Sequence, residues 1–345
     1  MVSVPFNTPL VLAVALSLHG LRKRSLSPSG AAAAFCVGYT MLSVPLRTFG
    51  VALIVFYLAG SRATKVGKSL KKQLEEGHQD AGYRNAAQVL CNSLSAAVAA
   101  LVWSALYEPN AWPSKVLDAA NVPQIISAQK VPFDLDAWCP LMPTPAASWS
   151  RALLFVTLGD ATALPPGAVE TLVLEYSGVI NFTDDLKHFA CCLGDTLASE
   201  LGILSRSPPI LITTLKVVPP GTNGGLSKVG TLASLMGGFI MGGTIAASLL
   251  VQSSACRAVW MDVLPPLLLW GTLAGGLGSL LDSILGATLQ RTRFINSTKR
   301  ILTDEAPEPA SGSDVKVVSG YDVLTNNQVN LVSSIATAVI LGALA

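Results

Sequence analysis

Long apolar stretches, separated by polar segments rich in proline and glycine, dominate the chain. Nearly uncharged runs of about 17 to 25 residues predict transmembrane helices. Five stretches meet this criterion: 5–21, 88–107, 229–251, 260–281 and 328–344. Residues 29–60 form a further run that Pro45 and Arg47 interrupt, which predicts two short helices that turn back on each other. With one more crossing in residues 151–204, the pattern predicts an all-α, polytopic membrane protein of about eight transmembrane helices.

Composition supports this class and excludes others. Hydrophobic residues make up 51% of the 345 residues and charged residues 13%, against about 25% charged in soluble proteins. The mean hydropathy is +0.53. A soluble enzyme is therefore excluded, and a net charge of +2 without a basic stripe gives no reason to expect a nucleic-acid partner. We interpret residues 1–345 as a single integral membrane domain whose first partner is the lipid bilayer.

The charges of the loops predict the orientation, because Lys and Arg are retained on the cytoplasmic side. Basic residues outnumber acidic ones in the loops 61–84 and 205–228, and the loop 291–327 begins with the basic residues Arg291, Arg293, Lys299 and Arg300. All three loops are predicted to be cytoplasmic. The acidic, proline-rich segment 108–150 is interpreted as a loop insertion on the other side. A basic cluster, Arg22–Arg24, follows the first apolar stretch, which favours a retained anchor with its N-terminus outside over a signal peptide.

These assignments agree only if residues 151–204 cross the membrane once. Residues 151–159 are too short to span, and residues 160–187 resemble a loop, with acids and prolines. Joining Gly159 directly to His188 would give one span of ordinary length. We interpret 160–187 as an insertion, either genuine or an unremoved intron in the gene model.

Cysteines and sequons add little. The six cysteines show neither a CxxC pair nor zinc-site spacing, so that we interpret them as small apolar residues without a disulfide framework. They are Cys36, Cys91, Cys139, Cys191, Cys192 and Cys256. The glycosylation sequons begin at Asn181 and Asn296; only the first lies on the predicted outer side, and both could be unused.

The densest polar patch at membrane depth is residues 194–202. On a helix, Asp195 and Ser199 lie one turn apart with Thr196 and Glu200 beside them, which gives one stripe with two carboxylates. Charges within a span cost roughly 2.5–3.5 kcal/mol each and usually face a cavity, an ion or a partner. A buried structural ion pair is the alternative, although no Lys or Arg lies within a turn of either acid.

A second patch, residues 281–290, ends the span 260–281. Asp282, Gly286 and Gln290 recur every four residues on one face, and Gly286 leaves room for a close-approaching group. The Asp-Ser pair of this patch parallels the Asp-Thr pair of the first. The alternative is that Asp282 is an acid of the membrane interface.

Mg²⁺ prefers hard oxygen ligands, usually one or two carboxylates together with substrate phosphates and water. The two patches therefore supply the candidate metal ligands Asp195, Glu200 and Asp282. Their polar neighbours are candidate substrate contacts. These are Thr196, Ser199, Ser283 and Gln290.

A glycine-rich loop lies between the two patches. Its candidate phosphate-binding residues are Gly221, Thr222, Asn223, Gly224 and Gly225. Converging backbone N–H groups and the N-terminus of the following helix can bind an anion. The spacing is not that of a Walker A motif, and turn formation alone is the alternative explanation.

An earlier polar series, Arg84, Gln88 and Asn92, follows a four-residue spacing into the membrane. Arg84 could clamp a phosphate with its guanidinium fork, whereas a ridge that only seals helix packing is the alternative. Further donors lie upstream, although a solvated cytoplasmic cluster explains most of them. They are Ser61, Arg62, Thr64, Lys65 and Lys68, of which Lys65 is a candidate nucleotide contact.

Taken together, these motifs resemble those of the transmembrane protein 19 family, whose plant members include the phytyl-phosphate kinase of tocopherol synthesis. The resemblance is carried by GDTLASELG, PPILITTLKVVPPGTNGGLSKVG, GSLLDSILGATLQ, RNAAQVLCN and NNQVNLVSS, and covers most of residues 25–107 and 188–345. It implies a membrane-embedded kinase that converts an isoprenyl monophosphate to a diphosphate with a nucleoside triphosphate, CTP being the favoured candidate.

The residues suggest how such a kinase would work, because phosphoryl transfer needs positioning and charge neutralisation. The three carboxylates would hold Mg²⁺, the glycine loop would cradle nucleotide phosphates, and Arg84 would grip the lipid phosphate. An apolar groove between small-residue helices would hold the tail, at a site open to the cytoplasm. No transit peptide is evident, so the endoplasmic reticulum or another endomembrane is expected rather than a plastid.

Two other classes of function remain open. Intramembrane carboxylates and glycine-broken helices also build ion-coupled secondary transporters. The absence of a convincing internal repeat, and the basic residues on the side of the carboxylates, count against this. The third class is a non-catalytic membrane protein.

Overall fold

The computed structural model describes residues 8–77, 82–108, 189–304 and 314–344, together with residues 115, 134, 136, 139–141 and 306. The predicted insertion 160–187 lies outside the described residues. The first helices are α1 (Thr8–Arg22), α2 (Pro28–Ser43), α3 (Thr48–Ala63), α4 (Lys68–Leu74), α5 (Ala86–Cys91) and α6 (Leu94–Tyr107). The later ones are α11 (Phe189–Gly202), α12 (Lys228–Gln252), α13 (Ser254–Ala258), α14 (Trp260–Leu289) and α15 (Asn326–Leu344).

The run 29–60 forms the two predicted helices, α2 and α3. Ser27 caps α2 by accepting a hydrogen bond from Gly30 N (3.0 Å), and Pro28 occupies the first turn, where its missing N–H costs nothing. The predicted span 88–107 is instead divided into α5 and α6.

Two helices of the described chain, α12 (25 residues) and α14 (30 residues), are long and apolar enough to cross a membrane. A third crossing results if α3 and α4, which are bent by 69° at their junction, form one broken span. Thus the helical membrane architecture is confirmed, whereas the number of eight crossings stays a prediction. The predicted span 260–281 ends too early: α14 continues to Leu289, so that Asp282 lies inside the helix and not at its end.

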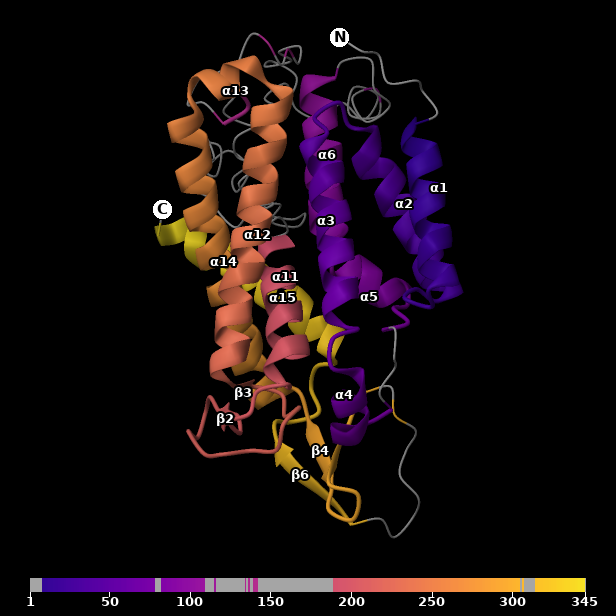
Figure 1. The fold of residues 1–345 in the computed structure, drawn as a ribbon, viewed down its shortest axis with the longest axis vertical. Helices are drawn as coiled ribbons and strands as arrows, with labels where there is room; N and C mark the ends of the chain where they lie inside the picture. The colour runs from indigo at the N-terminus through magenta and orange to yellow at the C-terminus, as the bar shows by residue number, and fades with distance from the viewer. Residues whose placement is uncertain are drawn as a thin grey trace.

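The prediction of an all-α fold is wrong in detail, because short strands cover one end of the helices (Figure 1). The strands are β1 (Glu75–Glu76), β2 (Ile210–Leu211), β3 (Gly225–Leu226), β4 (Thr292–Ile295), β5 (Arg300–Leu302) and β6 (Val315–Ser319). One sheet has the order β1-β5-β4-β6, and β2 pairs with β3. The predicted loop 291–327 therefore contains three strands. Parallel pairing of β1 with β5 fastens the segment after α4 beneath the ends of α14 and α15.

The ends of the helices agree with the loop charges. Helix α4, the β2–β3 hairpin and the larger sheet, which belong to the three loops predicted to be cytoplasmic, gather at one end, and α13 lies at the opposite end (Figure 1). The three predicted cytoplasmic loops thus lie at a common end.

A disulfide joins Cys139 to Cys256 across 117 residues, which corrects the interpretation of all cysteines as apolar packing residues. Ser254 also donates to Asp136 Oδ1 (3.2 Å). Both contacts fasten the predicted non-cytoplasmic segment 108–150 to the turn between α12 and α14. A disulfide is expected in an oxidising compartment, which agrees with that placement.

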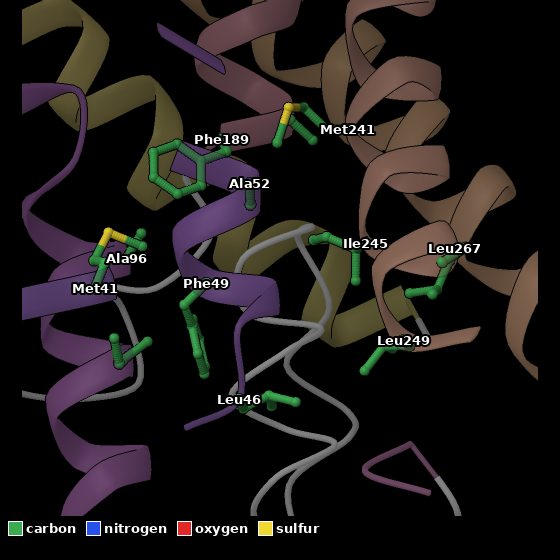
Figure 2. Packing of buried hydrophobic residues seen from close by; sticks show 14 of the residues in the cluster. Met41, Leu46, Phe49, Ala52, Ala96, Phe189, Met241, Ile245, Leu249 and Leu267 are labelled. Atoms are coloured by element: carbon green, nitrogen blue, oxygen red, sulfur yellow. The ribbon is translucent and has the colours of Figure 1, made fainter. Parts of the chain in front are cut away.

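One hydrophobic core joins the N-terminal helices α2, α3 and α6 to the later helices α11, α12 and α14 (Figure 2). Phe49 of α3 is 1% exposed and lies 6.2 Å, centroid to centroid, from Trp103 of α6. Phe56 of α3 reaches Phe189 of α11 at 5.1 Å. Met241 and further buried residues of α12 and α14 continue the cluster. Helix α11 is therefore held between α3 on one side and α12 with α14 on the other.

Glycines bring α11, α12 and α14 into backbone contact. A Cβ atom on Gly194 would lie 2.7 Å from the Cα of Gly275, and one on Gly237 would lie 2.8 Å from the Cα of Gly194. Such close approach is typical of small-residue packing in membranes. These contacts fix the height of α11 against α14, and with it the position of Asp195.

We expect Gly275→Ala to lower the melting temperature of the purified protein by several degrees. Its Cβ would lie 2.5 Å from Ser234 O and 2.7 Å from Gly238 N, both backbone atoms that can move only if α12 and α14 separate. Gly243→Ala is the control, since its Cβ would meet only a Leu268 methyl at 3.6 Å and alanine favours the helix. Equal melting temperatures for both variants would contradict this packing.

Candidate functional site

The two predicted aspartates lie on α11 and α14, which pack against each other and against α15. Asp195 of α11 accepts from Ser279 Oγ (3.5 Å), Asp282 of α14 accepts from Ser333 Oγ (3.0 Å), and the two carboxyl groups interact electrostatically. With its amide nitrogen toward α14, Asn330 donates to Asp282 Oδ2 (3.1 Å). No Lys or Arg among the described residues bonds to either carboxyl group. Two acids at membrane depth without a basic partner are suited to hold a cation.

The chemistry of this group fits Mg²⁺ in part. Two carboxylates from separate helices, with hydroxyl and amide groups behind them, are the hard oxygen set that Mg²⁺ takes when phosphates and water complete its shell. However, no three acidic, histidine or cysteine side chains converge on a metal position within the described part of the chain. The predicted set of three carboxylate ligands is therefore not assembled.

Glu200 is the missing member, because it forms an ion pair with Lys71 of α4. The Lys71 side chain is 1% exposed, and its Nζ also donates to Ala63 O (3.3 Å) and Thr64 O (3.4 Å) at the end of α3. These bonds satisfy the last carbonyls of α3, where a cation is favoured. The prediction of Glu200 as a metal ligand is thus replaced by the structural ion pair considered as its alternative, with a partner 129 residues away in sequence.

Arg84 lies just before α5, not on it. Its backbone N donates to Ser25 O (3.0 Å) and its backbone O accepts from Ser27 N (3.0 Å). Its guanidinium donates through Nη1 to Ser61 Oγ (3.2 Å) and through Nη2 to Thr64 Oγ1 (3.3 Å). Burial lowers the pKa of Arg84, and the nearby charge of Glu200 opposes this. Arginine stays protonated through such shifts, so that the group is a fixed cation.

This cation lines an apolar groove. The helices α1, α2, α3 and α5 form its walls, with an empty volume of about 800 Å³, mouth included. The predicted series Arg84, Gln88 and Asn92 lines it together with Thr196, although the series is not one helical ridge, because Arg84 precedes α5 and Asn92 is its C-cap. The predicted groove between small-residue helices is wrong in place: α12 and α14 touch through their backbones.

Helix α11 connects the groove to the carboxylates. A Cβ on Gly60 would lie 3.6 Å both from Arg84 Nη2 and from Thr196 Cγ2, so that both side chains border Gly60, and both line the groove. Its neighbour Asp195 faces α14. Consecutive residues of one helix therefore carry a carboxylate on one side and a groove contact on the other.

The glycine loop packs against α14 next to this centre. Gly221 and Gly224 have positive φ (88° and 76°), and a Cβ on Gly224 would lie 2.5 Å from Ser283 O. The group close to Gly286 is Asn223, 3.4 Å from its would-be Cβ. However, three amides of the loop already have acceptors within the protein. Thr222 N donates to Pro219 O (3.2 Å), Asn223 N to Thr292 Oγ1 (3.2 Å) and Gly225 N to Thr222 O (2.9 Å).

A family profile, that of the integral membrane protein DUF92, matches residues 11–338. The chain belongs to the DUF92 family. Protein PGR of Arabidopsis thaliana is 32% identical over 329 residues, which are 95% of this chain and 92% of that protein. Protein VTE6, chloroplastic, of the same plant is 33% identical over 105 residues, 30% of this chain and 28% of that protein. No solved structure matches the chain.

An uncharacterized membrane protein of Methanocaldococcus jannaschii is 38% identical over 112 residues, which are 32% of this chain and 42% of that protein. The match to DUF92 and its plant members confirms the resemblance to the transmembrane protein 19 family that the sequence motifs indicate.

In this DUF92 protein, the other predicted contacts are dispersed. Ser199 is exposed and donates to Thr196 O (3.1 Å), and Gln290 donates to Asp304 Oδ2 (3.4 Å) below the end of α14. Lys65 is exposed at the end of α3. None of these three side chains has a hydrogen bond to the carboxylate pair among the described residues, so that their binding roles stay predictions.

The sequence pattern alone did not indicate several residues that contact the two aspartates or Glu200. Asn330 and Ser333 lie in the motif NNQVNLVSS, which carried the resemblance without a role for its side chains. Ser279 lies three residues before Asp282, and this helical spacing could have indicated it. Lys71 gave no signal beyond the charge of its loop.

Proposed function

We propose that this protein is a membrane-embedded prenyl-phosphate kinase, which transfers a phosphoryl group from a nucleoside triphosphate to an isoprenyl monophosphate in a Mg²⁺-dependent reaction. One observation carries the proposal: Arg84 and Thr196 of α11 line one apolar groove, and Asp195, the residue before Thr196, interacts electrostatically with Asp282 of α14. The family resemblance to a phytyl-phosphate kinase supports it. CTP is the first nucleotide to test.

The acceptor lies in the groove in this proposal. Its branched hydrocarbon tail packs against the apolar walls, including Leu16, Val37 and Phe56. Arg84 binds the phosphate at the polar end, where its planar fork matches two oxygens of one phosphate. Thr196 of α11 lines the same groove.

The phosphoryl donor lies on the α14 side. Asp195 and Asp282 would hold Mg²⁺, and Ser279 and Ser333, which donate to the two carboxylates, would orient them. When bound, the ion supplies neutralisation of the charge on the transferred phosphoryl group. The glycine loop positions α14 and Ser283 through its packing, since only its Gly221 and Gly224 amides remain for phosphate among the five.

The membrane arrangement follows from the same placement. Eight helices, α1, α2, α3, α6, α11, α12, α14 and α15, make the membrane domain in this proposal, with the strand-bearing end in the cytoplasm where nucleotide is available. An endomembrane is the expected location. VTE6, by its name, is chloroplastic, so that the compartment needs a direct test by fluorescence microscopy of a tagged chain.

The test uses the full chain in nanodiscs with γ-labelled CTP or ATP and a panel of prenyl monophosphates from ten to twenty carbons. We expect label in a prenyl diphosphate, its loss on chelation of divalent cations with EDTA, and its return with excess Mg²⁺. Omission of the lipid is the control for hydrolysis. Absence of transfer with every nucleotide would overturn the kinase. Ion-driven substrate flux in proteoliposomes would then establish the transporter.

A further inference from the structure

The guanidinium of Arg84 is held by two hydroxyl groups at the end of α3. Ser61 and Thr64 are three residues apart and so lie on one face of the helix. Each accepts from a different terminal nitrogen, at 3.2 Å and 3.3 Å, and they are 8% and 4% exposed. Two separate acceptors fix both the position and the plane of the fork, which a single contact would leave free to rotate.

The hydroxyl and guanidinium protons of the cluster formed by Ser61, Thr64 and Arg84 determine what it can still bind. Thr64 Oγ1 donates its only proton to Gly60 O (3.0 Å), so that it can meet Arg84 solely as an acceptor. Ser61 Oγ likewise accepts from Arg84, and its own proton has no acceptor among the described residues. The guanidinium has five N–H groups, of which these contacts use two. The unused capacity at Arg84 and Ser61 therefore consists of donors attached to one cation.

A set of donors around a cation is suited to an anion and unsuited to a neutral or cationic head. Of the three residues of the cluster, Arg84 lines a groove whose walls are mostly apolar, and Thr196 of α11 lines the same groove. The closest anionic side chain, Glu200, is already paired with Lys71. Arg84 thus has no carboxylate bonded to it within the described chain, and an incoming anion meets no bound competitor.

We propose that Ser61 and Thr64 complete a phosphomonoester site with Arg84: Thr64 is a positioning residue for the guanidinium, and Ser61 both positions it and donates its hydroxyl proton to a phosphate oxygen. The inference rests on the proposed function and names the residues that recognise the acceptor's head. Binding of a phosphate head at this site requires neither nucleotide nor metal, because all three side chains come from the end of α3 and the segment before α5.

The test therefore measures binding alone, with dodecyl phosphate titrated into the full chain in nanodiscs without nucleotide or Mg²⁺. Dodecanol serves as the probe without a charged head. We expect the wild type to bind dodecyl phosphate about tenfold or more tightly than dodecanol. Thr64→Val, which keeps the shape and removes the acceptor, should weaken dodecyl phosphate binding about tenfold and leave dodecanol unchanged. Ser61→Ala should weaken it to a similar extent.

Two further variants separate positioning from a general structural effect. Thr64→Ser restores the hydroxyl and should restore dodecyl phosphate affinity to within about twofold of the wild type. Thr40→Val removes the same type of hydroxyl-to-carbonyl bond within α2 (2.9 Å to Cys36 O) and should change nothing. Unchanged phosphate affinity in Thr64→Val and Ser61→Ala, or a wild type that does not prefer the phosphate, overturns the inference. If dodecyl phosphate binding follows this pattern but no phosphoryl transfer is detected, the proposed kinase function is wrong and the proposed phosphomonoester site is retained.

Discussion

Replacing Asp195 or Asp282 by asparagine is expected to lower the kcat of phosphoryl transfer by about a thousandfold and to leave the protein at least as heat-stable as the wild type. The two effects have one cause. The carboxyl groups of Asp195 and Asp282 interact electrostatically and repel when both are charged, and asparagine removes one charge while its amide oxygen can still accept from Ser279 or Ser333. In a cation-binding site this repulsion destabilises the protein until the cation binds, whereas a structural ion pair contains no such repulsion.

The measurement combines single-turnover transfer at saturating Mg²⁺ with thermal melting without the metal. Asp262→Asn is the matched control, because Asp262 lies in the first turn of the same helix at the opposite end and is exposed. It should retain transfer within about twofold. Should Asp282→Asn turn over normally, or should either variant lose activity only in step with its melting temperature, the carboxylate pair is not the metal centre.

The sequence predicted those parts of the molecule that depend on local pattern. The division of 29–60 into α2 and α3 follows from Pro45, and α12 follows from an apolar run long enough to span. Asp195 and Asp282 stood out because a charge at membrane depth is expensive, whatever the fold around it. Their meeting could not be derived from spacing, since it depends on the glycine contacts among α11, α12 and α14.

What the sequence could not predict depends on partners distant in the chain. Cys139 and Cys256 have no spacing that indicates a bond. The four-stranded sheet at one end of the helices is built of strands of two to five residues, too short for an alternating pattern to appear. Arg84, Gln88 and Asn92 do line one groove, but not as the predicted helical face. Helix α5 begins after Arg84, so that a loop brings the guanidinium to the groove.

The ion-pair partner of Glu200 could not be predicted either, because Lys71 lies 129 residues away in the sequence. Glu200→Gln should lower the free energy of unfolding by roughly 3–5 kcal/mol, because it leaves the ammonium group of Lys71 buried at 1% exposure with neutral acceptors and no counter-charge. Reversible unfolding in mixed SDS and detergent micelles measures it. The exposed pair Arg300–Glu76 (37% and 38% exposed) provides the control, and Glu76→Gln should cost about 1 kcal/mol or less.

The double variant Lys71→Met with Glu200→Met separates the ion pair from the metal site. Two apolar side chains of similar length leave no unpaired charge, so that stability should return to within about 1 kcal/mol of the wild type, with the Mg²⁺ concentration for half-maximal transfer unchanged. A metal ligand behaves differently: its loss raises that Mg²⁺ requirement whether or not Lys71 is also replaced. A stable double variant that needs about tenfold more Mg²⁺ would therefore return Glu200 to the metal centre, beside Asp195 and one turn along the same helix.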